Sequence, residues 1–195
     1  MSEQQTGYAR GRARKKAILT AALAAFATRG YRGSSMAAIA EQVGLTEPGL
    51  LHHFRTKQQL MIALLEMREE ELRARAVWEP GKESLADHLT AVLVPNLKTP
   101  HVGQLFLTLA AESIDTDHPA HEWFVERYAR VRDMIRDRLR AAAGAGHLDP
   151  ETDHEELADQ LVAMADGLQL QWLLDPDNVD LVGRFRSFAG RVLNP

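Results

Sequence analysis

The residues whose chemistry stands out first are the cations near the amino terminus. Residues 1–60 carry nine Lys or Arg against three Glu, a formal charge of +6, whereas residues 61–195 carry 14 against 24, a charge of −10. The nine are Arg10, Arg12, Arg14, Lys15, Lys16, Arg29, Arg32, Arg55 and Lys57. A basic end on an acidic body can hold a polyanion at that end alone. A solvated charged surface has the same composition, so charge alone leaves both interpretations open.

Catalytic chemistry has little support in the rest of the sequence. The absence of Cys excludes disulfides, thiolate metal sites and Cys nucleophiles, and it suits a reducing cytosol. Gly-rich phosphate loops, Gly-x-Ser-x-Gly and paired Glu-x-x-His motifs are also missing. His118 and His121 could form a metal pair with His88 or His101, but no third ligand is specified. We therefore expect no enzyme activity, no cofactor and no metal.

The elements that carry these residues are expected to be helices. Helical periodicity runs along nearly the whole chain, and hairpin-forming alternation is missing, which predicts an all-α protein of about nine helices. The expected helices are about 12–29, 35–43, 46–54, 57–78, 82–97, 102–114, 118–143, 152–174 and 178–192. Gly30 is the expected stop of the first helix, and Ser35, Thr46 and Thr56 are expected caps.

No apolar run approaches the ~20 residues needed to span a bilayer, so we expect no membrane partner. The polar segment from Met1 to Gly11 lacks the features of a secretory signal. The sequence therefore predicts a cytoplasmic protein.

Residues 35–54 have the pattern of a helix-turn-helix. Four apolar residues are spaced to meet in one small core: Ile39, Val43, Leu45 and Leu50. Ala40 is small where the two helices would cross, and Gly44 allows the tight turn between them. The residues left outside this core are Thr46, Glu47, Pro48, Gly49, Leu51 and His52. They lie at the beginning and outer face of the third helix, where a recognition helix meets base edges.

Residues 14–60 resemble the amino-terminal domain of the tetracycline-repressor (TetR) family of bacterial regulators. The matching pieces are KKAILTAALAAFATRGYRGSSMAAIAEQVGLTEPGLLHHF and the following RTKQQL. The family pattern Gly-Val-Ser-x-x-Thr-Leu-Tyr-x-His-Phe-x-x-Lys corresponds to 44–57, with Gly49 and Leu51 in place of the usual threonine and tyrosine. Ala37 and Ala38 replace polar residues. The resemblance implies a homodimeric, ligand-responsive repressor that binds a palindromic operator and is released by a small-molecule effector.

The resemblance also implies roles for individual residues. His53 and Lys57 match positions that hold DNA phosphates, and the hydroxyls of Ser35 and Thr46 are placed to do the same. The alternative for His53 is a half-buried imidazole packed on the linker helix. The positions that fall where the family reads bases are Glu47, Pro48, Gly49 and Leu51, with His52 and the arm as further contacts.

The basic arm with Arg10, Arg12 and Arg14 resembles family extensions that follow the DNA backbone or enter the minor groove. We expect it to be disordered without DNA. The chain would then consist of a flexible arm (1–13), a helix-turn-helix domain (14–60) and a helical ligand-binding and dimerisation domain (61–195).

The last two helices carry apolar residues on two sides. This predicts a homodimer through a four-helix interface, with a fully buried helix in a monomer as the alternative. Candidate pocket-lining residues, each of which could equally be ordinary core, are Met67, Trp78, Phe106, Trp123, Phe124, Tyr128, Met134, Met164 and Trp172. The Arg-rich segment 127–140 is interpreted as a solvated, salt-bridged face.

Three other functions remain to be distinguished. They are an enzyme, a helical small-molecule carrier with only non-specific DNA binding, and a protein that compacts DNA without sequence preference.

Overall fold

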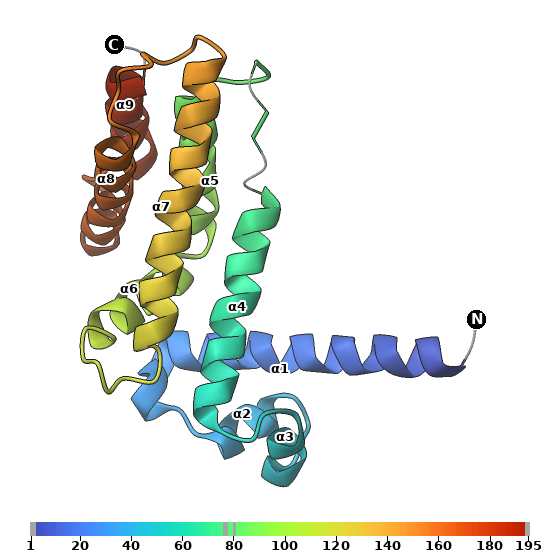
Figure 1. Cartoon of the computed structure of the whole chain (residues 1–195). Coiled ribbons are helices and arrows are strands. Elements are labelled where there is room, and N and C mark those ends of the chain that lie inside the picture. Colours follow the sequence, from blue (N-terminus) through green and yellow to red (C-terminus); the bar gives the residue numbers. More distant parts are fainter. Residues whose placement is uncertain (1–2, 76–77, 80, 194–195) are drawn as a thin grey trace. The chain divides into compact units, whose positions relative to one another are not determined.

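The computed structural model describes residues 3–75, 78–79 and 81–193, with the backbone alone for 3–10 and 75 (Figure 1). Its helices are α1 (Glu3–Gly33), α2 (Met36–Gln42), α3 (Glu47–His53), α4 (Lys57–Arg75), α5 (Leu85–Lys98), α6 (Pro100–Glu112), α7 (His121–Gly144), α8 (His154–Leu174) and α9 (Leu181–Leu193). The expected all-α class is confirmed. None of the described helices is long and apolar enough to cross a membrane.

The chain divides into two compact units, residues 1–71 and 72–195, and the division falls inside α4. The first unit holds α1, α2, α3 and most of α4. Its core is made of fully buried apolar side chains: Ile18, Ala22, Phe26, Ile39, Leu50, Leu60 and Leu64. Four residues were expected to form a small core between the second and third helices. Of these, Ile39 and Leu50 are completely buried, whereas Val43 and Leu45 are half-buried.

Helix α1 differs from expectation at its beginning. We expected a flexible arm before the first helix, but α1 is helical from Glu3 and takes in Arg10, Arg12 and Arg14. The segment contains Glu, Gln, Ala, Arg and Lys, which favour helix, and it has no proline to stop it. Its two glycines lower helix propensity by only about 1 kcal/mol each. The basic residues are therefore presented on a helix.

The end of α1 agrees more closely with the expectation from the sequence, which placed a stop at Gly30. Gly30 has φ 73° and ψ 165°, a non-helical conformation that interrupts the helix three residues before its last residue. Glycine adopts positive φ without the steric penalty that a Cβ would bring. The Ser34 hydroxyl donates to the Gly30 carbonyl oxygen at 2.9 Å and contacts that of Ala25 at 3.1 Å, which ties down the turn into α2.

The second unit is a bundle in which α5 packs on α9, α7 on α8, and α8 on α9. Its core includes Leu89, Leu139, Leu161, Leu181 and Phe185. Two helix starts have side-chain caps that satisfy otherwise unpaired amides. Ser84 accepts from the Asp87 N–H at 3.0 Å, and Asp153 accepts from the amides of Glu155 and Glu156. The bundle thus packs one face of α7 on this core.

Candidate DNA-contacting surface and ligand pocket

The segment that joins α2 and α3 is shaped by two capping side chains and a glycine. Ser35 caps α2 by accepting from the Ala38 N–H at 3.2 Å, and Thr46 caps α3 by accepting from the Gly49 N–H at 3.3 Å. Between them Gly44 takes φ 65°. Both expected caps and the glycine turn are confirmed. A serine or threonine cap stabilises a helix by about 1 kcal/mol, so these short helices depend on them.

The outer face of α3 is exposed. Glu47, Pro48 and His52 are exposed, Leu51 keeps 36% of its surface accessible, and Gly49 is half-buried. The opposite face packs inward through Leu50, which is fully buried. One side of α3 is thus anchored in the core. The other side exposes hydrogen-bonding groups, an apolar side chain and accessible backbone, so it can enter a DNA groove.

His53 lies on the surface next to His52, with ring centroids 5.9 Å apart in an edge-to-face arrangement. It is exposed, unlike the half-buried imidazole that was the alternative. Both histidines are in the last turn of α3.

The basic residues of α1 are placed beside the helix-turn-helix. The Arg14 guanidinium donates to the Val43 carbonyl oxygen at 3.1 Å, at the carboxyl end of α2. Lys15 lies over the Phe54 ring, with Nζ 5.5 Å from its centroid. Arg12 is exposed, whereas the side chain of Arg10 lies outside the described residues. Helix α1 therefore brings cations to the unit that also presents α3.

Lys57 is placed differently from an outward-pointing phosphate contact. Its ammonium donates to the carbonyl oxygens of Tyr31 at 2.8 Å and Ser34 at 2.9 Å. A longer contact of 3.5 Å reaches the Arg32 carbonyl oxygen, and Nζ lies 4.5 Å from the centroid of the Tyr31 ring. Lys57 thus joins the first residue of α4 to the turn between α1 and α2. Its sequence position alone did not indicate this contact.

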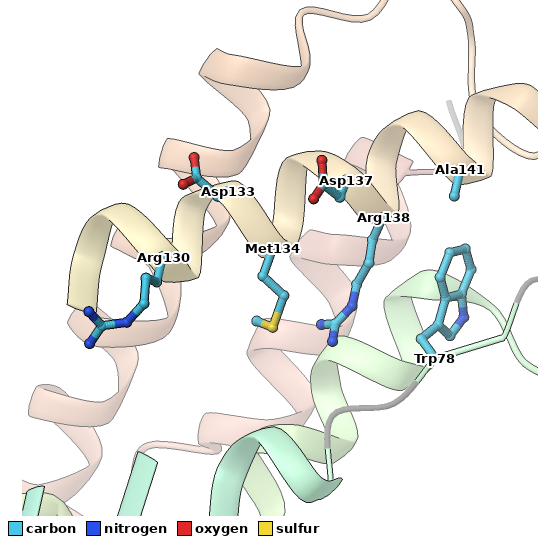
Figure 2. A pocket seen from close by; sticks show the side chains of 7 residues that line it. All are labelled: Trp78, Arg130, Asp133, Met134, Asp137, Arg138 and Ala141. Atoms are coloured by element: carbon cyan, nitrogen blue, oxygen red, sulfur yellow. The ribbon is translucent and has the colours of Figure 1, made fainter. Parts of the chain in front are cut away.

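The second unit contains a pocket of about 480 Å³ along one face of α7, within the size range of small-molecule sites (Figure 2). Its lining residues are Trp78, Arg130, Asp133, Met134, Asp137, Arg138 and Ala141. All except Trp78 follow the three- and four-residue spacing of one helical face. Trp78 was an expected lining residue, and Met134 was a second candidate. The four charged residues were not expected here, because segment 127–140 was interpreted as solvated.

The positive and negative side chains of the pocket point in different directions. Arg130, Met134 and Arg138 point to the side where Trp78 lies, whereas the Asp133 and Asp137 carboxylates point away (Figure 2). Asp133 is paired with Arg136, and Asp137 pairs with Arg140 at 3.1 Å. Partial burial lowers the pKa of the Arg138 guanidinium from its usual range.

The other expected ligand residues lie elsewhere. Trp123 is buried between two aromatic neighbours, with centroids 6.3 Å from Phe106 and 4.9 Å from Phe124. Met164 and Trp172 are partly buried against the core of the second unit. Met67 is half-buried on α4, in the first unit. None of these six residues lines the described pocket.

Tyr128 connects α7 to α8. Its hydroxyl donates to the Asp166 carboxylate at 2.7 Å. Burial, followed by the charge and hydrogen bond of Asp166, raises the pKa of Tyr128 to about 12. This half-buried pair is a polar contact between two helices, and Tyr128 is not among the residues of the pocket.

His118 and His121, just before and at the first residue of α7, contact Ser113 across the preceding loop. The His118 ring and the Ser113 hydroxyl are 2.8 Å apart, and His121 Nδ1 lies 2.8 Å from the Ser113 carbonyl oxygen. Within the described part of the chain, no three His, Cys, Asp or Glu side chains are grouped so as to hold a metal ion.

Comparison with known proteins gives two family matches. Residues 18–64 match the model of bacterial regulatory proteins of the tetR family, and residues 80–193 match the carboxyl-terminal domain of BetI-type transcriptional repressors. The chain is 32% identical over 192 residues to the HTH-type transcriptional regulator TtgR of Pseudomonas putida, covering 91% of this chain and 88% of the relative.

Two further similarities span most of the chain. The HTH-type transcriptional repressor AcnR of Corynebacterium jeikeium is 28% identical, over 80% of this chain and 79% of its own. A solved TetR-family regulator from Rhodococcus sp. superposes with a TM-score of 0.78 at 25% identity, covering 92% of this chain and 98% of that one.

Proposed function

Since the chain belongs to the TetR family of bacterial regulatory proteins and is a ligand-responsive DNA-binding transcriptional regulator, we propose that it represses transcription from a palindromic operator. It would bind as a homodimer and leave when a small molecule binds. The observation that carries this proposal is the exposed outer face of α3, held by a capped turn in the unit with the basic residues. Paired recognition helices in a dimer match two half-sites.

The caps of α2 and α3 have a second function in this proposal. Ser35 and Thr46 each accept a backbone hydrogen bond, which leaves the hydroxyl hydrogen able to donate to a phosphate oxygen. His53 is exposed in the last turn of α3 and would add a further donor to the DNA backbone. Such contacts set register without reading sequence.

Base reading is assigned to the beginning and outer face of α3. The Glu47 carboxylate would accept from cytosine N4, and Leu51 would contact a thymine methyl group. Gly49 has no side chain and Pro48 has a compact one, so the backbone of α3 can approach the bases closely. His52 would add a hydrogen bond at the far end of the helix. Glu47 is therefore the residue whose replacement should change base preference most.

The helical arm would contribute electrostatic affinity. Arg10, Arg12 and Arg14 would follow the DNA backbone as part of α1. For Lys57 the contacts favour a positioning role, in which its ammonium holds the first turn of α4 near the turn before α2. A phosphate contact by Lys57 would require the ammonium to leave those carbonyl oxygens.

The homodimer is proposed to form through α8 and α9. Leu170 and Leu174 lie one turn apart on α8 and are 49% and 77% exposed. Gly167, one turn earlier, has no atom within 4 Å of the place where a Cβ would stand. A stripe that is open and apolar over two turns can be covered by the same stripe of a second copy. The remaining residues, 61–195, would form the ligand-binding and dimerisation domain.

A regulator that binds operators must reach the chromosome, so we propose that the protein acts in the cytoplasm, at the nucleoid. Its partners there would be the operator duplex, a second copy and the effector.

Selection from random double-stranded DNA at near-physiological salt tests the proposal. An enriched palindrome whose half-sites are separated by about one helical turn, or a multiple of it, is the expected result. Sequences recovered without enrichment would contradict it and favour the helical carrier with only non-specific DNA binding.

A further inference from the structure

We propose that the α7 pocket takes an aromatic anion, a flat apolar molecule with one carboxylate or phosphate group. The pocket lies on one face of the helix, where Arg130, Met134 and Arg138 follow each other at four-residue intervals (Figure 2). The inference rests on the proposed function only in naming this ligand the effector. Binding itself depends on the pocket alone.

The charge that faces the pocket is positive. Asp133 and Asp137 belong to the lining, but their carboxylates point away from Trp78 and are paired with Arg136 and Arg140. Arg130 and Arg138 remain on the pocket side, about 12 Å apart along a helix that rises 1.5 Å per residue. A cation placed between them would be repelled, whereas one anionic group can reach either of them.

Each of the two arginines has a feature suited to an anion. Arg130 bonds through Nη1 to Glu126 at 3.2 Å, and its buried Nε has no hydrogen-bond partner among the described residues. Arg138 is partly withdrawn from water. Charge-assisted hydrogen bonds gain strength where the local dielectric is low, and a guanidinium can bind both oxygens of a carboxylate or phosphate.

The rest of the lining suits a flat apolar body. The Trp78 indole N–H donates to the Glu83 carbonyl oxygen at 3.3 Å, which holds the ring in place at one end of the pocket. Met134 supplies a flexible, polarizable side chain between the two arginines, and Ala141 leaves room beside the indole. An aromatic ring can therefore stack near Trp78 while its acidic group reaches Arg138.

Isothermal titration of the full chain without DNA tests this inference with four probes that share one ring system. They are 2-naphthoate, 2-naphthyl phosphate, the uncharged 2-naphthamide and the 2-naphthyltrimethylammonium cation. We expect the anions to bind at least about tenfold more tightly than the amide, the effect of one charged hydrogen bond, and the cation to bind most weakly. The stronger of the two anions identifies the acidic group.

Four single variants locate the site. Arg138→Gln and Arg130→Gln should each weaken 2-naphthoate binding about tenfold. Arg132→Gln is the matched control, because it removes one positive charge from the same helix but pairs with Asp159 at 3.5 Å and does not line the pocket. Arg138→Lys retains the charge and should keep part of the affinity if Arg138→Gln unfolds the protein.

Four results would overturn the inference: equal binding of amide and anion, preferred binding of the cation, no heat from either anion at millimolar concentration, or an equal loss in the Arg132→Gln control. A second titration with operator DNA separates this inference from the proposed function. Binding of 2-naphthoate without release of DNA would support the pocket chemistry and count against the effector role.

Discussion

Replacing Lys57 by Met should destabilise the amino-terminal unit even when no DNA is present. The substitution keeps most of the apolar stem and removes the ammonium that donates to the Tyr31 and Ser34 carbonyl oxygens. A hydrogen bond to a charged group contributes about 1.5–3 kcal/mol, and a cation over an aromatic face about 0.5–1 kcal/mol at exposed sites. Because Lys57 is only half-buried, water offsets part of this, and we expect a loss of about 2–3 kcal/mol.

The assay is urea unfolding followed by circular dichroism, with thermal unfolding as a second measurement. For a chain of this length about 1 kcal/mol corresponds to about 2–4 °C, so the melting temperature should fall by about 5–10 °C. Lys16→Met is the control, because Lys16 is exposed on α1 and its replacement removes the same charge. It should change stability by less than about 0.5 kcal/mol.

A different result would show that Lys57 does not stabilise this unit. If Lys57→Met unfolds like the unmodified protein, and the salt slope of its DNA binding falls by about one, Lys57 contacts a phosphate and does not join α4 to the turn between α1 and α2. The contacts to α1 would then be a resting position of the side chain.

Three further predictions concern the recognition helix, the dimer and the α7–α8 contact. Glu47→Ala should change the preferred base at one position of each half-site and leave the salt slope unchanged; selection from random DNA would contradict this if the consensus stayed the same. Leu170→Glu combined with Leu174→Glu should yield monomers in sedimentation velocity, because two like charges would face their copies, and a persisting dimer would move the interface elsewhere. Tyr128 has a pKa raised to about 12, so its contribution to stability is complete below its unfolded pKa of about 10 and is lost between about pH 10 and 12. Tyr128→Phe should lack that loss in urea unfolding across this range, and parallel profiles for the two proteins would contradict the assignment.

Much of the fold could be predicted because local signals and tertiary structure agree. Ser35, Thr46 and Thr56 were expected at helix starts, and each side-chain oxygen accepts the expected amide hydrogen bond. Gly30 and Gly44 have the positive φ that a break and a tight turn require. These features depend on a few neighbouring residues, so the sequence contains them.

Features that depend on distant partners were harder to predict. The arm is an exception, because its signal is local: its basic and polar composition favoured a flexible segment, but its own residues favour helix and α1 extends through it. The sequence predicts a pocket lined mainly by aromatic residues, yet Trp123 and Phe124 are buried in the bundle. The arginines of α7 were assigned to solvent, and a pattern of alternating charge does not reveal which of them meets a cavity. The repeated spacing of Arg130, Met134 and Arg138 is the signal that could have indicated it.

The central claim is that this protein recognises one DNA sequence through paired α3 helices. Titration of the selected duplex and a scrambled duplex at physiological salt, with the stoichiometry of the complex, tests it most directly. We expect two protomers, or a multiple of two, on each selected duplex and an affinity at least about 10³-fold above that for the scrambled one. Equal affinity for both duplexes, collapsing alike as salt rises, would contradict it.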